Sequence, residues 1–477
     1  MGEASRRGSD EQRSKDAIRR RKSELIEQLG GRDEKADSVL RSGIAPFLER
    51  LSPDEWERRR LEIVNALNQR PQPEGLALAE AIRVSDDEIA WYLFLCQQAL
   101  EDPLCVDSHQ LARAAPFFAG IGQRWSHSSR VAGLEKKIYE VLHRYKKEPD
   151  GLIFEILTAL AYAEAGWIVE FLDEQPQAKT PDMRVTKGNV QLYVECKRLA
   201  RRTGYSDQER TSFLRLWDAS KDILVEKRQW VWFKGVIHVE VDSIDAGFLA
   251  DIFRDALPIN ESESTIYDGP EATIQARLID KQSVKNHLAK WRIKADSPMI
   301  AHLLGGDWAP ANSSWSVMKE AELSHVVDCE IPLLGRYIEN IQWACGFTRY
   351  FDAEISLQKK ARDITKHLAK AVEQVPADLP SVIHIAAETL EGSVVERLRT
   401  EKVMAKIPQF VSNKPVVAVR FHRFQANQTI DKLWEFDETV EKFQINGMKI
   451  KDIPQSVVVP DTAQMKSGRH WELYPSA

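Results

Sequence analysis

A buried helix is the first element that the pattern of hydrophobic positions predicts in the middle of the chain. Residues 152–162 read LIFEILTALAY, and nearly every position is apolar, as in a helix that is covered on all sides. Asp150 is placed to cap its start, and Gly166 follows its end. Glu155 is the only acidic residue in its first three turns, and a buried carboxylate needs a partner. A strand is expected next, at 167–172.

A β-hairpin over residues 180–199 is the second prediction. Two runs of alternating apolar and polar residues flank the Gly-Asn dipeptide at 188–189, which is the signal of a two-residue turn. Counting outward from this turn sets Asp182 opposite Glu195. Because side chains alternate between the faces of a strand, Asp182, Glu195 and Lys197 share one face, and the other face is apolar.

Two opposed carboxylates destabilise a sheet unless a cation lies between them. Hard oxygen ligands in this arrangement favour Mg²⁺ or Mn²⁺, which bind one or two carboxylates and leave other positions to water and phosphate. Lys197 lies on the same face, where it could orient or deprotonate a water molecule and neutralise charge on a phosphate. The hairpin therefore predicts a metal-dependent phosphodiesterase centre.

These residues resemble the PD-(D/E)xK nuclease superfamily, whose pattern is an acidic residue on a helix, Pro-Asp on the second strand and Glu-x-Lys on the third. Glu155, Asp182 after Pro181, and Glu195 with Lys197 fill that pattern here, within residues 150–202 of 477. The alternatives are an ordinary surface hairpin with a weak ion pair and a nuclease fold that only binds.

The resemblance implies a role for each residue. Asp182, Glu195 and the backbone carbonyl of Cys196 would hold Mg²⁺ or Mn²⁺, and Lys197 would activate water for in-line attack. Glu155 would hold a second metal ion or an outer-shell water. The implied fold is α/β (α+β), a restriction-endonuclease-like core in which helices flank a central mixed β-sheet.

An all-helical N-terminal domain is expected before this core, because Ser52 and Ser85 begin capping boxes that open amphipathic runs. The predicted organisation is a charged tail at 1–35, the helical domain at 36–147, the nuclease core at 148–243, a mixed insertion or accessory segment at 244–350 and an α/β C-terminal segment at 351–477.

Such a core needs one more helix and one more strand after Lys197, and the chain offers two candidate units. The earlier unit ends in a strand at 236–241 that alternates apolar and polar residues, as an edge strand does. The later unit, residues 356–388, ends in a strand that is apolar almost throughout, as expected of a strand covered on both faces. We therefore expect 356–388 to complete the core and 230–350 to form an elaboration beside it.

The net charge of −6 excludes a general polycation, so nucleic acid would have to bind at local basic patches. One patch follows the Glu-x-Lys strand directly, and a second lies along a predicted amphipathic helix. Basic runs nearer the N-terminus are interspersed with acidic residues and are interpreted as solvated. The candidate phosphate-binding residues are Arg198, Arg201, Arg202, Lys359, Arg362 and Lys366.

Other polar residues have more than one interpretation. Arg420, His422 and Arg423 lie in a strand predicted over 415–424, where they could face phosphate or form one solvent-exposed face. His384 is interpreted as a core or near-site histidine with its hydrogen bonds satisfied. The five cysteines form no CxxC pair, so neither a zinc site nor a disulfide framework is expected.

The resulting prediction is a cytoplasmic nuclease. No apolar run approaches the about 20 residues that cross a bilayer, and the charged N-terminus lacks the apolar core of a secretory signal. The resemblance implies DNA more than RNA as substrate, in restriction, repair or phage defense. A non-catalytic binding module and an RNA or branched-DNA nuclease are the alternatives. A homodimer, and a protein partner for the N-terminal helices, stay open.

Overall fold

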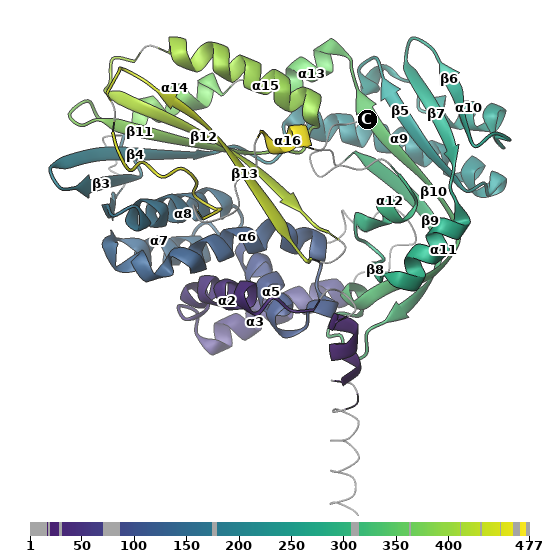
Figure 1. The fold of residues 1–477 in the computed structure, drawn as a ribbon, viewed down its shortest axis with the longest axis horizontal. Coiled ribbons are helices and arrows are strands. Elements are labelled where there is room, and N and C mark those ends of the chain that lie inside the picture. Colours follow the sequence, from purple (N-terminus) through teal and green to yellow (C-terminus); the bar gives the residue numbers. More distant parts are fainter. Residues whose placement is uncertain are drawn as a thin grey trace, which may run out of the picture.

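Two mixed β-sheets with helices packed on them make up the mixed α/β fold of this chain (Figure 1). The computed structural model describes residues 17, 20–27, 31–69, 86–173, 179–306, 314–361, 364–410, 412–429, 432–448, 450–460 and 468–473.

The first sheet has seven strands in the order β1-β2-β3-β4-β11-β12-β13. Its centre is parallel, because β4, β11 and β12 run in one direction, whereas β3 and β13 are antiparallel to their inner neighbours. The strands are β1 (Val131–Ala132), β2 (Ile168–Phe171), β3 (Met183–Lys187), β4 (Val190–Arg198), β11 (Ser381–Glu388), β12 (Val416–Asn427) and β13 (Glu435–Gln444).

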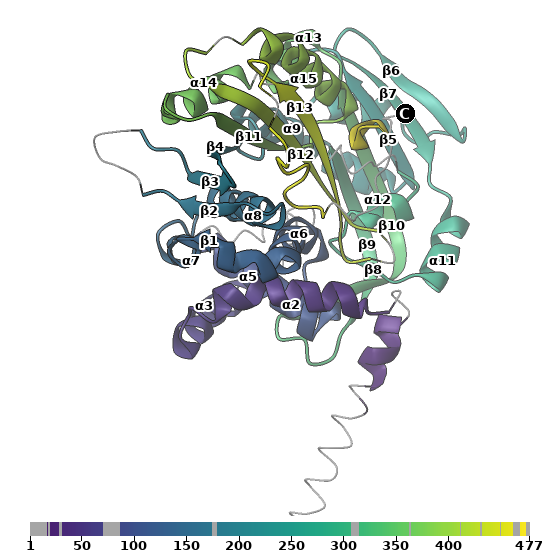
Figure 2. The ribbon, with the colours of Figure 1, turned by 60° about the vertical axis from the view of Figure 1, so that its left-hand side comes forward.

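Helices cover both faces of this sheet (Figures 1 and 2). One face packs on α6 and α8, whose apolar residues join those of β3 and β4 in a single cluster. The other face packs on α14 and α15 in a second cluster. The helices concerned are α6 (Ser108–Arg124), α7 (Leu134–His143), α8 (Asp150–Glu164), α13 (Glu354–Lys360), α14 (Thr365–Gln374) and α15 (Ser393–Lys406).

The second sheet has the order β6-β7-β5-β10-β8, with β9 also paired to β10. The long helix after β4, α9, packs here rather than on the first sheet. The elements are α9 (Gly204–Lys227), β5 (Val231–Ile237), α10 (Phe248–Ala256), β6 (Glu263–Asp268), β7 (Ala272–Leu278), α11 (Lys281–Lys290), β8 (Ile293–Lys294), α12 (Met299–Leu303), β9 (Trp315–His325) and β10 (Arg336–Phe351).

The N-terminal region is largely helical, but the predicted all-helical range also contains β1, and its described helices have no core of their own. Their apolar residues belong to the same cluster as those of α8 and the first sheet. Ser52 caps α3 as expected, by accepting a hydrogen bond from the Glu55 N–H, whereas Ser85 lies outside the described residues and α5 is capped by Asp87. The helices are α2 (Glu34–Leu48), α3 (Pro53–Asn68) and α5 (Glu88–Glu101).

The strand beside β4 is β11, which is the one that the sequence favoured. Ile383 pairs with Glu195 and Ile385 with Lys197, in parallel. Both faces of β11 are buried, which explains its continuous apolar run. The earlier candidate strand, β5, lies in the second sheet and starts five residues before the predicted 236–241. The predicted single helix before β11 is two helices, α13 and α14.

Candidate active site

The β3–β4 hairpin has the register that the sequence predicted. Lys187 pairs with Val190 at the turn, and Met183 pairs with Val194 at the far end of the ladder. Gly188 has a φ of 58°, a conformation that glycine adopts without strain and that a type II′ hairpin turn needs at its first position. The next position beyond the ladder places Asp182 opposite Glu195.

Asp182 and Glu195 are held by hydrogen bonds across the hairpin. The Asp182 N–H donates to Glu195 Oε2 at 3.2 Å, and the Cys196 N–H donates to Asp182 Oδ2 at 2.6 Å. Glu195 is fully buried, and Asp182 is partly buried. The expected juxtaposition of the two carboxylates is therefore present, and each is fixed by a backbone amide of the other strand.

Lys197 forms an ion pair with Glu195 Oε1. Its side chain is 24% exposed whereas that of Glu195 is not exposed at all, so the pair connects a buried carboxylate to the surface of the site. The same Oε1 atom is buried. The Lys197 ammonium is the partner that the structure gives this oxygen.

Glu155 lies on α8, close enough to Asp182 to act on its charge, and it has a partner that the sequence did not reveal. Lys137 on α7 places its Nζ 2.7 Å from Glu155 Oε2. The side chains are 17% and 13% exposed, so the pair is largely buried. A carboxylate in an apolar helix signalled that a partner was needed, but nothing in the sequence pointed to α7.

All three carboxyl groups have raised pKa values, and burial is the largest cause for each. Burial, followed by the nearby Glu155 and Glu195, raises the pKa of Asp182 well above its ordinary value. Burial raises the pKa of Glu195 to about 7, although Lys197 acts in the opposite direction. The pKa of Glu155 is also raised by burial against the pull of Lys137. Negative charge here is costly, and an added cation would offset that cost.

The donors at this site suit a hard divalent cation. Asp182 and Glu195 offer carboxylate oxygens, and one of these, Glu195 Oε1, is buried beside the Lys197 ammonium. The Cys196 side chain is buried in the apolar cluster, so this residue could contribute only its backbone carbonyl. Within the described part of the chain, no three His, Cys, Asp or Glu residues are grouped as metal ligands.

Arg198 is not a surface residue, contrary to its expected contact with phosphate. Its guanidinium donates to Glu388 Oε1 at 2.6 Å and lies over the rings of Phe117 and Phe424. Glu388, at the end of β11, also pairs with Arg113 at 3.2 Å. This arginine belongs to a buried charge cluster, because Glu388 and the two aromatic rings enclose it.

The other candidate phosphate-binding residues differ in their surroundings. Arg201 contacts Glu388 at 3.3 Å, but its side chain is 38% exposed. Lys359 is paired with Glu240 at 2.6 Å. Lys366 is exposed on α14, Arg202 is partly buried, and Arg362 lies outside the described residues.

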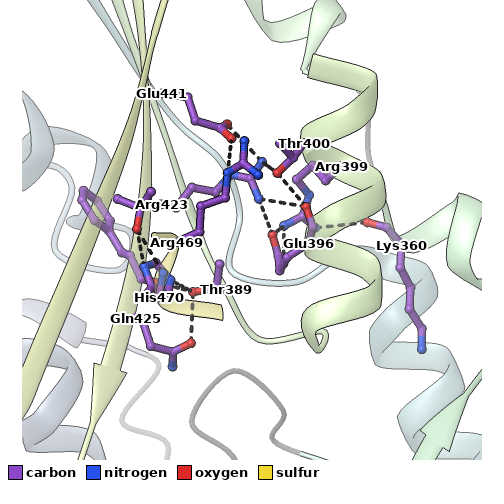
Figure 3. A network of polar contacts seen from close by, with 12 residues as sticks. Lys360, Thr389, Glu396, Arg399, Thr400, Arg423, Gln425, Glu441, Arg469 and His470 are labelled. Carbon is purple, nitrogen blue, oxygen red and sulfur yellow. Dashed lines mark hydrogen bonds and ion pairs between the residues drawn. The ribbon is translucent and has the colours of Figure 1, made fainter. Parts of the chain in front are cut away.

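The residues Arg420, His422 and Arg423 face neither phosphate nor solvent. Strand β12 lies inside the sheet, and the side chains of His422 and Arg423 are fully buried. Figure 3 shows Arg423 between two acidic partners, Glu396 Oε2 at 2.7 Å and Glu441 Oε2 at 3.2 Å. Both interpretations of these residues were wrong, because helices cover the strand on both faces.

His384 is a core histidine with satisfied hydrogen bonds, as expected, and it belongs to a chain that crosses the sheet. Tyr162 Oη lies 3.2 Å from His384 Nε2, His384 Nδ1 lies 2.9 Å from His422 Nε2, and His422 Nδ1 lies 2.7 Å from Glu438 Oε1. Each side chain in this series has a polar partner, and burial lowers the pKa of His384. Glu438 also accepts from the backbone N–H groups of Val457, Val458 and Val459.

None of the helices in the described ranges is long and apolar enough to cross a membrane. No family model, no curated protein and no solved structure matches this chain.

Proposed function

We propose that this protein is a Mg²⁺- or Mn²⁺-dependent nuclease of the PD-(D/E)xK type, with DNA as its expected substrate. The observation that carries the proposal is the convergence of Asp182, Glu195 and Lys197 at the hairpin. Raised pKa values and a specific charge partner in one cluster are typical of functional sites.

The order of elements supports a restriction-endonuclease-like core. Helix α8 is followed by β2, β3 and β4, and α14 and β11 follow after the second sheet. In space, β2, β3, β4 and β11 are consecutive strands, with β11 parallel to β4. Helices α8 and α14 cover opposite faces of these strands. The residues that form the second sheet are then an insertion between β4 and α14.

Each residue of the site has a role in this proposal. Asp182, Glu195 and the Cys196 carbonyl would hold the metal ion, which supplies Lewis-acid activation of the phosphoryl group when bound. Lys197 would orient the attacking water and neutralise charge that develops on the phosphate. The backbone amides that fix both carboxylates keep these oxygens in place, so little reorganisation is needed during the reaction.

Contacts to the nucleic-acid backbone are proposed for exposed cations near the site. Arg201 is partly exposed beyond the end of β4, and Lys366 is exposed on α14. Arg198 would act only indirectly, through its pair with Glu388. Phosphate contacts position a strand and carry no sequence information. Restriction, repair or phage defense in the cytoplasm are the settings that this activity fits.

The test is a cleavage assay with Lys197→Ala on linear, nicked and branched DNA and on RNA with Mg²⁺ or Mn²⁺. We expect cleavage to fall by at least about 100-fold with DNA binding retained. Lys187→Ala is the matched control, because Lys187 lies on the same hairpin and pairs with Asp452 away from the site. Undiminished cleavage by Lys197→Ala would overturn the site, and an inactive wild type with intact binding would favour a binding module.

A further inference from the structure

We propose that Lys137 takes the place of a second metal ion, so that the centre binds a single divalent cation. This inference rests on the proposed function and goes beyond it, because the resemblance left Glu155 free to hold a second ion. The Lys137 ammonium would instead be a fixed cation of the centre and a positioning residue for Glu155.

Glu155 forms a short ion pair with Lys137. The Nζ of Lys137 lies 2.7 Å from Glu155 Oε2 and 4.0 Å from Glu140 Oε2. It also lies over the ring of Phe171, 5.3 Å from the ring centroid. Two carboxylates and one aromatic face therefore surround this ammonium group, and the side chain is largely buried. A side chain held in this way is part of the site and not a mobile surface lysine.

Glu155 is held by a different element from the other two carboxylates. Asp182 and Glu195 are fixed to each other's strands by backbone amides, whereas Glu155 is fixed to α7 through Lys137. The ligand set thus divides into two carboxylates for a metal ion and one for a lysine.

Electrostatics disfavour a second divalent ion beside this lysine, because like charges repel. A two-metal centre places its ions about 4 Å apart. The carboxylate that a second ion would use already contacts an ammonium group, and Asp182 lies close enough to Lys137 to interact with its charge. An ammonium group is a compact point charge with three donors. It can balance the negative charge of Glu155 and Asp182 without the several coordinating oxygens that a metal ion needs.

The test is the number of Mn²⁺ ions bound per chain, measured by electron paramagnetic resonance and calorimetry on the full-length protein. We expect one ion for the wild type and a second, weaker ion for Lys137→Met, in which Glu155 is released. Lys136→Met is the matched control on the same helix, because Lys136 is exposed and pairs with Asp173. It should bind one ion.

A second variant keeps the inference falsifiable if Lys137→Met does not fold. Glu155→Gln should still bind one Mn²⁺, since Glu155 is not a ligand. Its affinity should fall by less than about tenfold, because a nearby negative charge is removed. Two ions in the wild type, one ion in Lys137→Met, or a large loss of affinity in Glu155→Gln would each overturn the inference. A wild type that binds no Mn²⁺ would instead overturn the proposed function.

Discussion

Asp182 and Glu195 support each other reciprocally across the hairpin: Glu195 accepts the Asp182 N–H, and Asp182 accepts the N–H of the residue after Glu195. The arrangement needs the acceptor oxygens but not both negative charges. Burial and two neighbouring carboxylates hold the pKa of Asp182 well above its ordinary value, so its charge is a cost to the metal-free fold. This separates the role of Asp182 in stability from its proposed role in catalysis.

The first prediction follows for Asp182→Asn. The amide oxygen can still accept the Cys196 N–H, and the costly charge is removed. We expect the metal-free variant to be more stable than the wild type at pH 7, by on the order of 1 kcal/mol, while Mg²⁺-dependent cleavage is lost. Urea unfolding and a cleavage assay measure the two effects. A variant that is less stable, or one that still cleaves DNA, would contradict this interpretation.

The second prediction concerns the buried cluster around Glu388. Glu388→Gln leaves Arg113 and Arg198 without their shared carboxylate, and removal of one partner from a buried ion pair is strongly destabilising. We expect the free energy of unfolding to fall by about 3 kcal/mol. Glu320→Gln is the control, because its pair with Arg228 is about half exposed; there we expect a loss below about 1 kcal/mol. Equal losses of unfolding free energy in the two variants would show that Glu388 is not part of a buried, stabilising charge cluster.

The third prediction is the pH dependence of the same contribution. Burial alone would raise the pKa of Glu388, but Arg113, Arg198 and Arg201 outweigh it and hold the pKa at about 2. The folded pKa is below the ordinary value of 4.5, so the stabilisation is complete above that value and is lost as the pH falls through about 2. The difference in unfolding free energy between wild type and Glu388→Gln should shrink over this range. A difference that stays constant would show that Glu388 is not the titrating group.

The fourth prediction separates the two ends of the buried chain of hydrogen bonds. Tyr162→Phe removes one donor and leaves His384 Nε2 unpaired, for an expected loss of about 1 kcal/mol. Glu438→Leu leaves His422 and three backbone amides without their acceptor, and the loss should be at least about 3 kcal/mol. Tyr139→Phe, at an exposed tyrosine, should be neutral. Thermal and urea unfolding would measure the stability of all three variants. A larger loss for Tyr162→Phe than for Glu438→Leu would contradict this chain of hydrogen bonds.

Local patterns predicted the hairpin and its register. The turn dipeptide and the alternation on either side are properties of neighbouring residues, so they fixed the pairing of Lys187 with Val190 and placed Asp182 opposite Glu195. The same reasoning gave the buried helix that carries Glu155. The continuous apolar run of β11 also indicated its position at the centre of a sheet.

The sequence did not predict which distant elements pack against one another. Lys137 meets Glu155 only because α7 packs on α8, and its exposed neighbour Lys136 has the same side chain. Arg198 belongs to a basic run that is typical of a surface, yet Glu388, from a strand far along the chain, makes its burial tolerable. Arg423 is similar, since two carboxylates from other elements surround it. Such partners become visible only when the strand order is known.

The insertion between β4 and β11 has a consequence for how the chain reaches its folded state. β4 ends at Arg198, and its central neighbour begins only at Ser381. Until that part of the chain is available, β4 presents an open edge, and unpaired strand edges promote association between chains. Contacts between residues so far apart in sequence also slow folding. Refolding should therefore be slow and should lose yield at high protein concentration, and a fragment that ends before β11 should aggregate.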